Sequence, residues 1–205
     1  MLKAKIAVLV SGGGTNLQAL IDAQKSGILK SGRLALVISS SPGAYALTRA
    51  AENGIPAVTV ARRDYASQKE FEEALKARLE EHGIELIVLA GFLCILSGDF
   101  TGAYPRRILN VHPSLVPAFC GRGYYGLRVH EAVLEYGVKV TGATVHYVNE
   151  IPDGGEIILQ QAVPVHKSDT PRTLQRRVME RAEWKILPRA VELAAGRLQK
   201  GKKQT

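Results

Sequence analysis

The sequence is poor in cysteine and in long apolar runs, and it has no cluster of metal ligands. Two cysteines among 205 residues form no spaced framework, so we expect a reducing compartment, the cytoplasm. No apolar stretch approaches the roughly 20 residues that span a membrane. The opening MLKAKIAVLV is too short for a signal peptide. Histidine and cysteine never occur at metal-ligand spacing, so we expect neither a metal ion nor a membrane partner.

Aromatic residues make up only 6% of the chain, although its net charge is +8. Nucleic-acid-binding proteins usually combine a basic surface with a recognisable motif. This sequence contains no such motif, so we expect no nucleic-acid partner. The C-terminal GRLQKGKKQT carries part of the positive charge. The remainder favours anionic ligands such as phosphates and carboxylates.

Short apolar runs alternate with helical patterns along the first half of the chain. The apolar runs are KIAVLV, LALVIS, AVTV, ELIVLAG and RILNVH. This alternation predicts an α/β fold with a mostly parallel, twisted sheet and helices on both faces. Among the helices, QKEFEEALKARLEEHG is amphipathic, and Glu72 lies one turn before Lys76, as in a helix ion pair.

The second half of the chain follows a different pattern. VKVTGATVHYV and EIILQQAVPV are longer strand patterns joined by a turn, which indicates an antiparallel edge of the sheet. A long helix is expected from Thr170 to about Leu198. Because no linker divides the chain, we predict a single domain, residues 1–198, followed by a basic tail, residues 199–205.

A glycine-rich turn, SGGGTN at residues 11–16, lies between a predicted strand and a predicted helix. Glycine lets a backbone turn tightly and approach a ligand, and a helix N-terminus favours an anion such as phosphate. The segment is neither a dinucleotide fingerprint nor a Walker A loop. A plain strand-to-helix turn is the alternative, although three consecutive glycines exceed what such a turn requires.

The segment NVHPSLVP places an amide and an imidazole at the end of a predicted strand. Asn110 and His112 point to the same side of that strand, because strand side chains alternate. They are either a polar pair at a strand end or groups aimed at a substrate. Asp153, in DGG, is either a turn residue or a carboxylate that orients His112 and raises its pKa. His146 is either a core residue or a support for this site.

Nucleophilic catalysis is not indicated by the sequence. Cys94 follows an apolar strand, and Cys120 lies in a loop without the flanking pattern of a known nucleophile. Ser114 likewise lacks a nucleophile-elbow context. We therefore expect no covalent intermediate.

Five segments together resemble a known family: SGGGTNLQALI, LAGFLCILS, ILNVHPSLVP, GATVHYV and DGGEIILQ. In this order they resemble the phosphoribosylglycinamide formyltransferases, folate-dependent enzymes of purine synthesis. The resemblance covers about Lys5 to about Leu198 and implies a Rossmann-like formyltransferase fold. It also implies transfer of a formyl group from 10-formyltetrahydrofolate, a co-substrate, to the amine of N1-(5-phospho-D-ribosyl)glycinamide. The implied substrates are small molecules, and the oligomeric state is either monomer or dimer.

The resemblance implies roles for individual residues. Asn110, His112 and Asp153 match the catalytic amide, the imidazole and its carboxylate partner. The positions that match the phosphate and ribose site are Gly14, Thr15, Asn16 and Glu183. The positions that match the folate site are Gln68, Leu93, Cys94, Ile95, Leu96, Asn110, Val148 and Asp153.

Some positions depart from the family pattern. The family often has arginine where this chain has Cys94, and an arginine at the folate tail where SQKEF offers Gln68 or Lys69. The loop FCGRGYYGLRVH, residues 119–130, is several residues longer than the usual version. The alternatives are a formyltetrahydrofolate deformylase, a methionyl-tRNA formyltransferase, which would carry a further RNA-binding domain, and a non-enzymatic phosphate-binding module.

Overall fold

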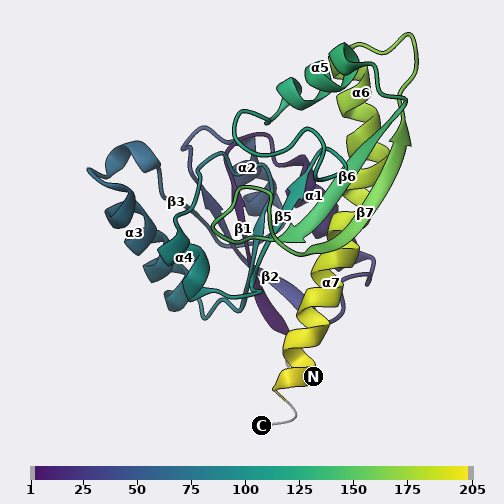
Figure 1. Cartoon of the computed structure of the whole chain (residues 1–205). Helices are drawn as coiled ribbons and strands as arrows, with labels where there is room; N and C mark the ends of the chain where they lie inside the picture. The colour runs from purple at the N-terminus through teal and green to yellow at the C-terminus, as the bar shows by residue number, and fades with distance from the viewer. Residues whose placement is uncertain (1–2, 203–205) are drawn as a thin grey trace.

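A seven-stranded sheet forms the centre of the molecule in the computed structural model, which describes residues 3–202 (Figure 1). The strand order is β3-β2-β1-β4-β5-β6-β7. The neighbouring strands β3, β2, β1, β4 and β5 pair in parallel. At the other edge, β6 pairs antiparallel with β5, and β7 pairs antiparallel with β6. The strands are β1 (Ala4–Val10), β2 (Gly32–Ser39), β3 (Ala57–Thr59), β4 (Leu86–Leu89), β5 (Ile108–His112), β6 (Val140–Tyr147) and β7 (Ile157–Pro164). The predicted mostly parallel sheet with an antiparallel edge is confirmed.

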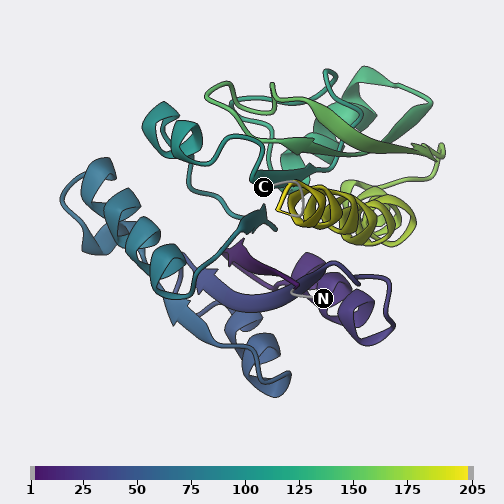
Figure 2. The ribbon, with the colours of Figure 1, turned by 90° about the horizontal axis from the view of Figure 1, so that it is seen from below.

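Helices cover both faces of this sheet (Figures 1 and 2). One face packs against α1, α2, α5, α6 and α7, and the other packs against α3 and α4. The helices are α1 (Thr15–Lys25), α2 (Tyr45–Glu52), α3 (Gln68–Glu81), α4 (Gly98–Ala103), α5 (Leu127–Tyr136), α6 (Pro171–Val178) and α7 (Trp184–Gly201). Among residues 3–202, no helix has both the length and the apolar character needed to cross a membrane.

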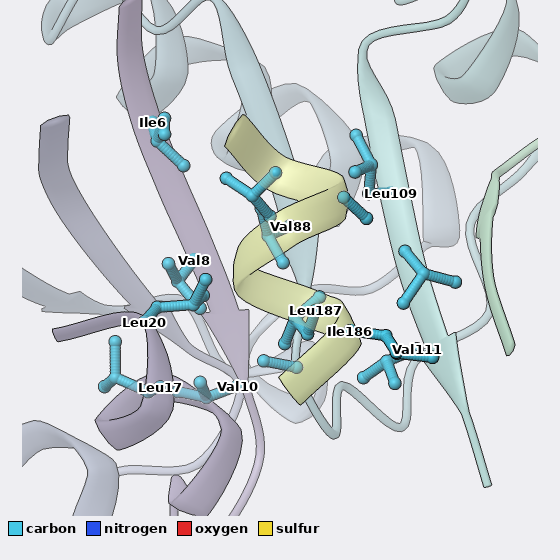
Figure 3. Packing of buried hydrophobic residues seen from close by; sticks show 14 of the residues in the cluster. Ile6, Val8, Val10, Leu17, Leu20, Val88, Leu109, Val111, Ile186 and Leu187 are labelled. Carbon is cyan, nitrogen blue, oxygen red and sulfur yellow. The ribbon is translucent and has the colours of Figure 1, made fainter. Parts of the chain in front are cut away.

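The larger core cluster lies between the sheet and α1 and α7 (Figure 3). It joins side chains of β1, β4 and β5 to both helices; the labelled ones are Ile6, Val8, Val10, Leu17, Leu20, Val88, Leu109, Val111, Ile186 and Leu187. Burial of each aliphatic side chain of this kind contributes about 1.5–3 kcal/mol. This packing fixes the sheet as a rigid support for the loops at its carboxyl edge.

The strand order reverses direction between β1 and β4. The chain goes from β1 to β2 and β3 on one side and then returns to β4 on the other side of β1. The loops that follow two neighbouring parallel strands separate at such a reversal, and the crevice between them is the usual ligand site of an open α/β sheet. The glycine-rich turn follows β1, and the segment Gly91–Leu96 follows β4, so both border this crevice.

The C-terminal helix differs from the prediction of one uninterrupted helix from Thr170 to about Leu198. Thr170 caps α6 with a capping box, and Pro171 occupies its first turn. A five-residue π-helical segment, Met179–Glu183, then separates α6 from α7, which continues to Gly201. A π turn adds one residue to a helical turn, and an apolar pattern does not reveal it. The first residues of the predicted basic tail are therefore helical, and residues 203–205 lie outside the described residues.

Candidate active site

Strand β5 places Asn110 and His112 at the carboxyl edge of the sheet. Across the antiparallel pairing with β6, Asn110 lies opposite His146 and His112 lies opposite Thr144. His112 is 4% exposed. Same-side alternation along a strand thus puts an amide and an imidazole next to each other, as the sequence predicts.

The loop between β6 and β7 brings Asp153 to these two side chains. Asp153 has a positive φ of 55°, which is uncommon for a residue other than glycine. The two glycines that follow allow the loop to fold closely. A Cβ on Gly155 would overlap the carbonyl oxygen of Tyr147, and a Cβ on Gly154 would lie 2.6 Å from Ile151. The DGG motif is therefore required by the path of the loop, which aims the carboxylate at β5.

The Asp153 carboxylate contacts four groups. Its Oδ1 accepts a hydrogen bond from Asn110 Nδ2 at 3.2 Å and lies 3.4 Å from His146 Nε2. Its Oδ2 lies 3.5 Å from His112 Nδ1 and accepts a hydrogen bond from the Gly121 N–H at 2.8 Å. Burial alone would raise the pKa of Asp153, but the contacts with His146, His112 and Gly121 lower it below its ordinary value. The carboxylate is therefore ionised near neutral pH.

The loop after β5 fixes the orientation of the His112 imidazole. His112 Nε2 lies 2.8 Å from the carbonyl oxygen of Phe119. A carbonyl oxygen only accepts, so Nε2 carries a proton and Nδ1 is the nitrogen that faces Asp153. Phe119 has a positive φ of 50°, and its ring makes edge contacts with the rings of Tyr124 and Tyr136. The contacts of the Phe119 carbonyl with His112 and of the Gly121 N–H with Asp153 were not predictable from the sequence, because any residue type supplies a carbonyl or an N–H.

His146 belongs to this site, although the sequence left a core role open. It is 1% exposed, and its Nδ1 donates to the carbonyl oxygen of Tyr147 at 2.8 Å. Its Nε2 therefore faces the site, 3.2 Å from Asn110 Nδ2 and 3.4 Å from Asp153 Oδ1. Both readings of the sequence hold together: the side chain is buried, and it supports the amide and the carboxylate.

Other titratable groups near the site are poorly suited to nucleophilic catalysis. Burial raises the pKa of the Cys94 and Cys120 thiols, and the charge of Asp153 adds to this at Cys120. A raised thiol pKa lowers the fraction of thiolate, the nucleophilic form. His130 is fully buried, and burial lowers its pKa to about 4, so it is neutral at physiological pH.

The glycine-rich turn has one packed side and one open side. Gly14 has a φ of 70°, and a Cβ there would lie 2.7 Å from the Cβ of Ala46. A Cβ on Gly12 or Gly13 would meet no atom within 4 Å, and neither residue has a left-handed φ. Packing within the protein therefore explains glycine at position 14 but not at positions 12 and 13. The open space at positions 12 and 13 leaves room for a ligand to approach the backbone.

Asn16 and Glu183 meet beside this turn. Asn16 Nδ2 donates to Glu183 Oε2 at 2.7 Å, and both residues are buried. Burial raises the pKa of Glu183, while the hydrogen bond from Asn16 opposes that change. Asn16 Oδ1 is buried and has no hydrogen-bond partner among the residues that the structure describes. Such an unpaired acceptor is costly unless a ligand supplies the donor.

A cleft lined in part by Asn110, His146 and Asp153 contains most of the predicted folate-site residues. It is lined by Leu89, Phe92, Cys94, Ile95, Leu96, Asn110, His146, Val148, Asn149, Glu150, Pro152 and Asp153. Leu93 lies outside this lining; its side chain is mostly exposed, and its N–H donates to Ser11 Oγ at 2.9 Å. Gln68 Nε2 donates to the carbonyl oxygen of Ile95, so Gln68 borders the cleft. The Lys69 side chain is 86% exposed.

Two residues that sequence reasoning missed organise the edge of this cleft. The sequence predicts an ion pair between Glu72 and Lys76, and the structure does not form it. Glu72 is instead buried and accepts hydrogen bonds from the Ser97 N–H and from Gln68 Nε2. Arg62 Nε donates to Gln68 Oε1 at 3.2 Å, which puts a guanidinium beside the predicted folate-tail position. Helical spacing predicts which residues are neighbours on one helix, and it led to the expected Glu72–Lys76 pair. It does not show which loop packs over that helix.

A larger cavity, of about 590 Å³, lies between α1 and α7. Thr15 and Arg49 line it, but Asn110, His112 and Asp153 do not. The convergence of charged and hydrogen-bonding groups identifies the site better than cavity size does. Within residues 3–202, no three His, Cys, Asp or Glu side chains are close enough together to hold a metal ion.

Comparisons with known proteins identify the family of this chain. The family model described as formyl transferase matches residues 4–191. The chain is 40% identical to the phosphoribosylglycinamide formyltransferase of Haemophilus influenzae, over 95% of this chain and 89% of that protein. It is 46% identical to the trifunctional purine biosynthetic protein adenosine-3 of Gallus gallus over 97% of this chain, but it spans only 19% of that protein.

Solved structures of similar proteins have the same fold. Glycinamide ribonucleotide transformylase 1 from Symbiobacterium toebii superposes with a TM-score of 0.88 at 44% identity, covering 95% of this chain and 88% of that one. The phosphoribosylglycinamide formyltransferase from Brucella melitensis superposes with a TM-score of 0.86 at 38% identity, covering 95% and 96%. The chain therefore belongs to the formyl transferase family, among the phosphoribosylglycinamide formyltransferases.

Proposed function

We propose that this protein transfers a formyl group from 10-formyltetrahydrofolate to the amine of N1-(5-phospho-D-ribosyl)glycinamide, a step of de novo purine biosynthesis in the cytoplasm. Both substrates are small molecules, and the reaction requires neither nucleic acid nor a membrane. The observation that carries the proposal is the meeting of Asn110, His112 and Asp153 beside the cleft. A module that only binds phosphate needs the turn but has no use for these three side chains.

The proposed reaction is a direct attack without a covalent enzyme intermediate. The substrate amine forms a bond to the formyl carbon, and the formyl oxygen becomes an oxyanion. The bond between that carbon and the folate nitrogen then breaks. The attacking nitrogen loses one proton and the folate nitrogen gains one, so no proton is consumed overall. The enzyme must stabilise the oxyanion and move this proton.

Asn110 and His112 are suited to these two tasks. Asn110 Nδ2 and His112 Nδ1 contact different oxygens of the Asp153 carboxylate, so both nitrogens face the same region. Asn110 donates to the oxyanion, and His112 stabilises the same charge and delivers the proton to the leaving nitrogen. Asp153, ionised near neutral pH, lies 3.5 Å from His112 Nδ1 and holds the imidazole in place.

The two substrates approach from opposite sides of these groups. The N–H groups of Gly14, Thr15 and Asn16 and the positive end of α1 bind the phosphate. The unpaired Asn16 Oδ1 and the Glu183 carboxyl accept hydrogen bonds from the ribose hydroxyls. The pterin ring of the folate occupies the cleft between the segments 92–96 and 148–153. Arg62, beside Gln68, binds a carboxylate of the folate tail.

The test is an assay with both substrates and a control without the amine. Purified protein is mixed with 10-formyltetrahydrofolate and glycinamide ribonucleotide, and deformylated folate and formylated product are followed separately. Formylated product that appears only with the amine substrate supports the transferase. Deformylation that proceeds equally without the amine points to a deformylase. The absence of both signals, with phosphate binding retained, points to a binding module.

A further inference from the structure

Helix α2 donates hydrogen bonds to two carbonyl groups of the glycine-rich turn. The Ala46 N–H donates to the carbonyl oxygen of Gly12 at 3.1 Å. Arg49 Nε donates to the carbonyl oxygen of Gly13 at 2.9 Å, and Arg49 Nη1 donates to Gln18 Oε1 at 2.9 Å. Arg49 thus joins the turn to the first part of α1 with one planar guanidinium.

These bonds determine where the next two N–H groups point. In a trans peptide, the C=O and the N–H of one peptide plane point in opposite directions. The carbonyl of Gly12 points toward α2, so the N–H of Gly13 points away from it. The same relation turns the Gly14 N–H away from Arg49. Neither N–H donates to an acceptor within the described part of the chain, and the surroundings of Gly12 and Gly13 are open.

The guanidinium of Arg49 is itself held in place. Its central carbon lies 5.0 Å from the centre of the Tyr45 ring, in a cation–π contact. Gly14 packs directly against Ala46, which fixes the distance between α2 and the turn. A fork of two donors in fixed geometry reaches two acceptors at once, and a lysine ammonium on its flexible stem does not reproduce it.

We propose that Arg49 is a positioning residue for the phosphate of the substrate: it fixes the carbonyl side of the turn, so that the Gly13 and Gly14 N–H groups face the anion. The inference rests on the proposed function, because it deepens the role of the same phosphate site. It assigns to Arg49 an effect through the backbone, not direct contact with the reacting atoms. The consequence falls on binding of the phosphate, and not on the formyl-transfer step.

The experiment compares the wild-type protein with Arg49→Lys, which keeps the positive charge and loses the fork. We expect the KM for glycinamide ribonucleotide to rise about tenfold, as loss of a hydrogen bond to a charged group predicts. We expect kcat and the KM for 10-formyltetrahydrofolate to stay near the wild-type values. Calorimetry with ribose 5-phosphate gives the same loss of affinity without any turnover. Arg78→Lys is the matched control, because Arg78 lies on α3 and its guanidinium pairs, within residues 3–202, only with exposed Glu81.

Wild-type affinity for ribose 5-phosphate in Arg49→Lys would overturn the inference, because charge alone would then account for Arg49. A wild-type protein that binds ribose 5-phosphate but transfers no formyl group would refute the proposed function and leave the calorimetric comparison valid. A measurement on the wild type alone covers the case in which the variant fails to fold. The amide resonances of Gly13 and Gly14 must shift when ribose 5-phosphate is added, and unchanged resonances would also overturn the inference.

Discussion

Two neighbouring glycines of the glycine-rich turn are expected to respond to the same substitution with opposite changes in stability. In Gly13→Ala the new Cβ meets no atom within 4 Å, and the backbone is not left-handed. Such a change stabilises a protein by about 0.4–1 kcal/mol, because it restricts the unfolded chain. In Gly14→Ala the φ of 70° costs about 1–2 kcal/mol. The contact of 2.7 Å with Ala46 adds about 1–3 kcal/mol of overpacking.

The assay separates folding from binding. For a domain of this size, thermal unfolding should show Tm raised by about 1–4 °C in Gly13→Ala and lowered by about 4–20 °C in Gly14→Ala. Steady-state kinetics on Gly13→Ala should nevertheless show a raised KM for glycinamide ribonucleotide, because the methyl group occupies the side that the phosphate approaches. A Gly13→Ala protein that is less stable than the wild type, or that keeps the wild-type KM, would refute the reasoning.

Three further predictions concern the catalytic pair and one ion pair. Asp153→Asn should lower turnover by about 10²–10³ with an unchanged melting temperature; full turnover across neutral pH would contradict the pairing with His112. Nitrogen NMR should find the proton of neutral His112 on Nε2, opposite the Phe119 carbonyl, and a proton on Nδ1 would contradict that orientation. Hydrogen bonds from Arg177 lower the pKa of Asp169 from 3.8 to about 2, so this pair stabilises the fold above pH 4 and is lost as pH falls through about 2. Asp169→Asn should therefore destabilise the protein by about 1.5–3 kcal/mol at pH 7, in urea unfolding, and by only a small part of that at pH 2.

The sheet was predictable because its evidence is repeated along the chain. Each parallel strand is a short, wholly apolar run followed by a helical pattern, and the connection between parallel strands requires such a crossover. The π-helical segment Met179–Glu183 was not predictable in this way. It changes the phase of the helix by one residue, and the composition of the segment remains that of an ordinary helix.

The site was predictable where side chains carry it and unpredictable where the backbone does. Strand alternation alone puts Asn110 beside His112, and the family resemblance adds Asp153. The carbonyl of Phe119 and the N–H of Gly121 complete the arrangement, but every residue type has these groups. The path of a loop decides which of them reaches the site, and a loop carries no periodic pattern.

We propose that the long loop after β5 acts on catalysis through the position of its backbone, and a surface aromatic pair tests this. The Tyr124 ring contacts the Phe119 ring, whose carbonyl holds His112. Tyr124→Ala removes an edge contact worth about 0.5–1.5 kcal/mol, which corresponds to a loss of up to about tenfold in kcat if the imidazole is freed to the same extent.

Tyr125→Ala is the matched control, because the Tyr125 ring lies under Arg128 and is likewise exposed at the surface. We expect its kcat to equal that of the wild type, and the pH profile of kcat to shift only in Tyr124→Ala, since only there does His112 lose its restraint. Equal kinetics in the two variants would mean that the loop covers the site without orienting the imidazole.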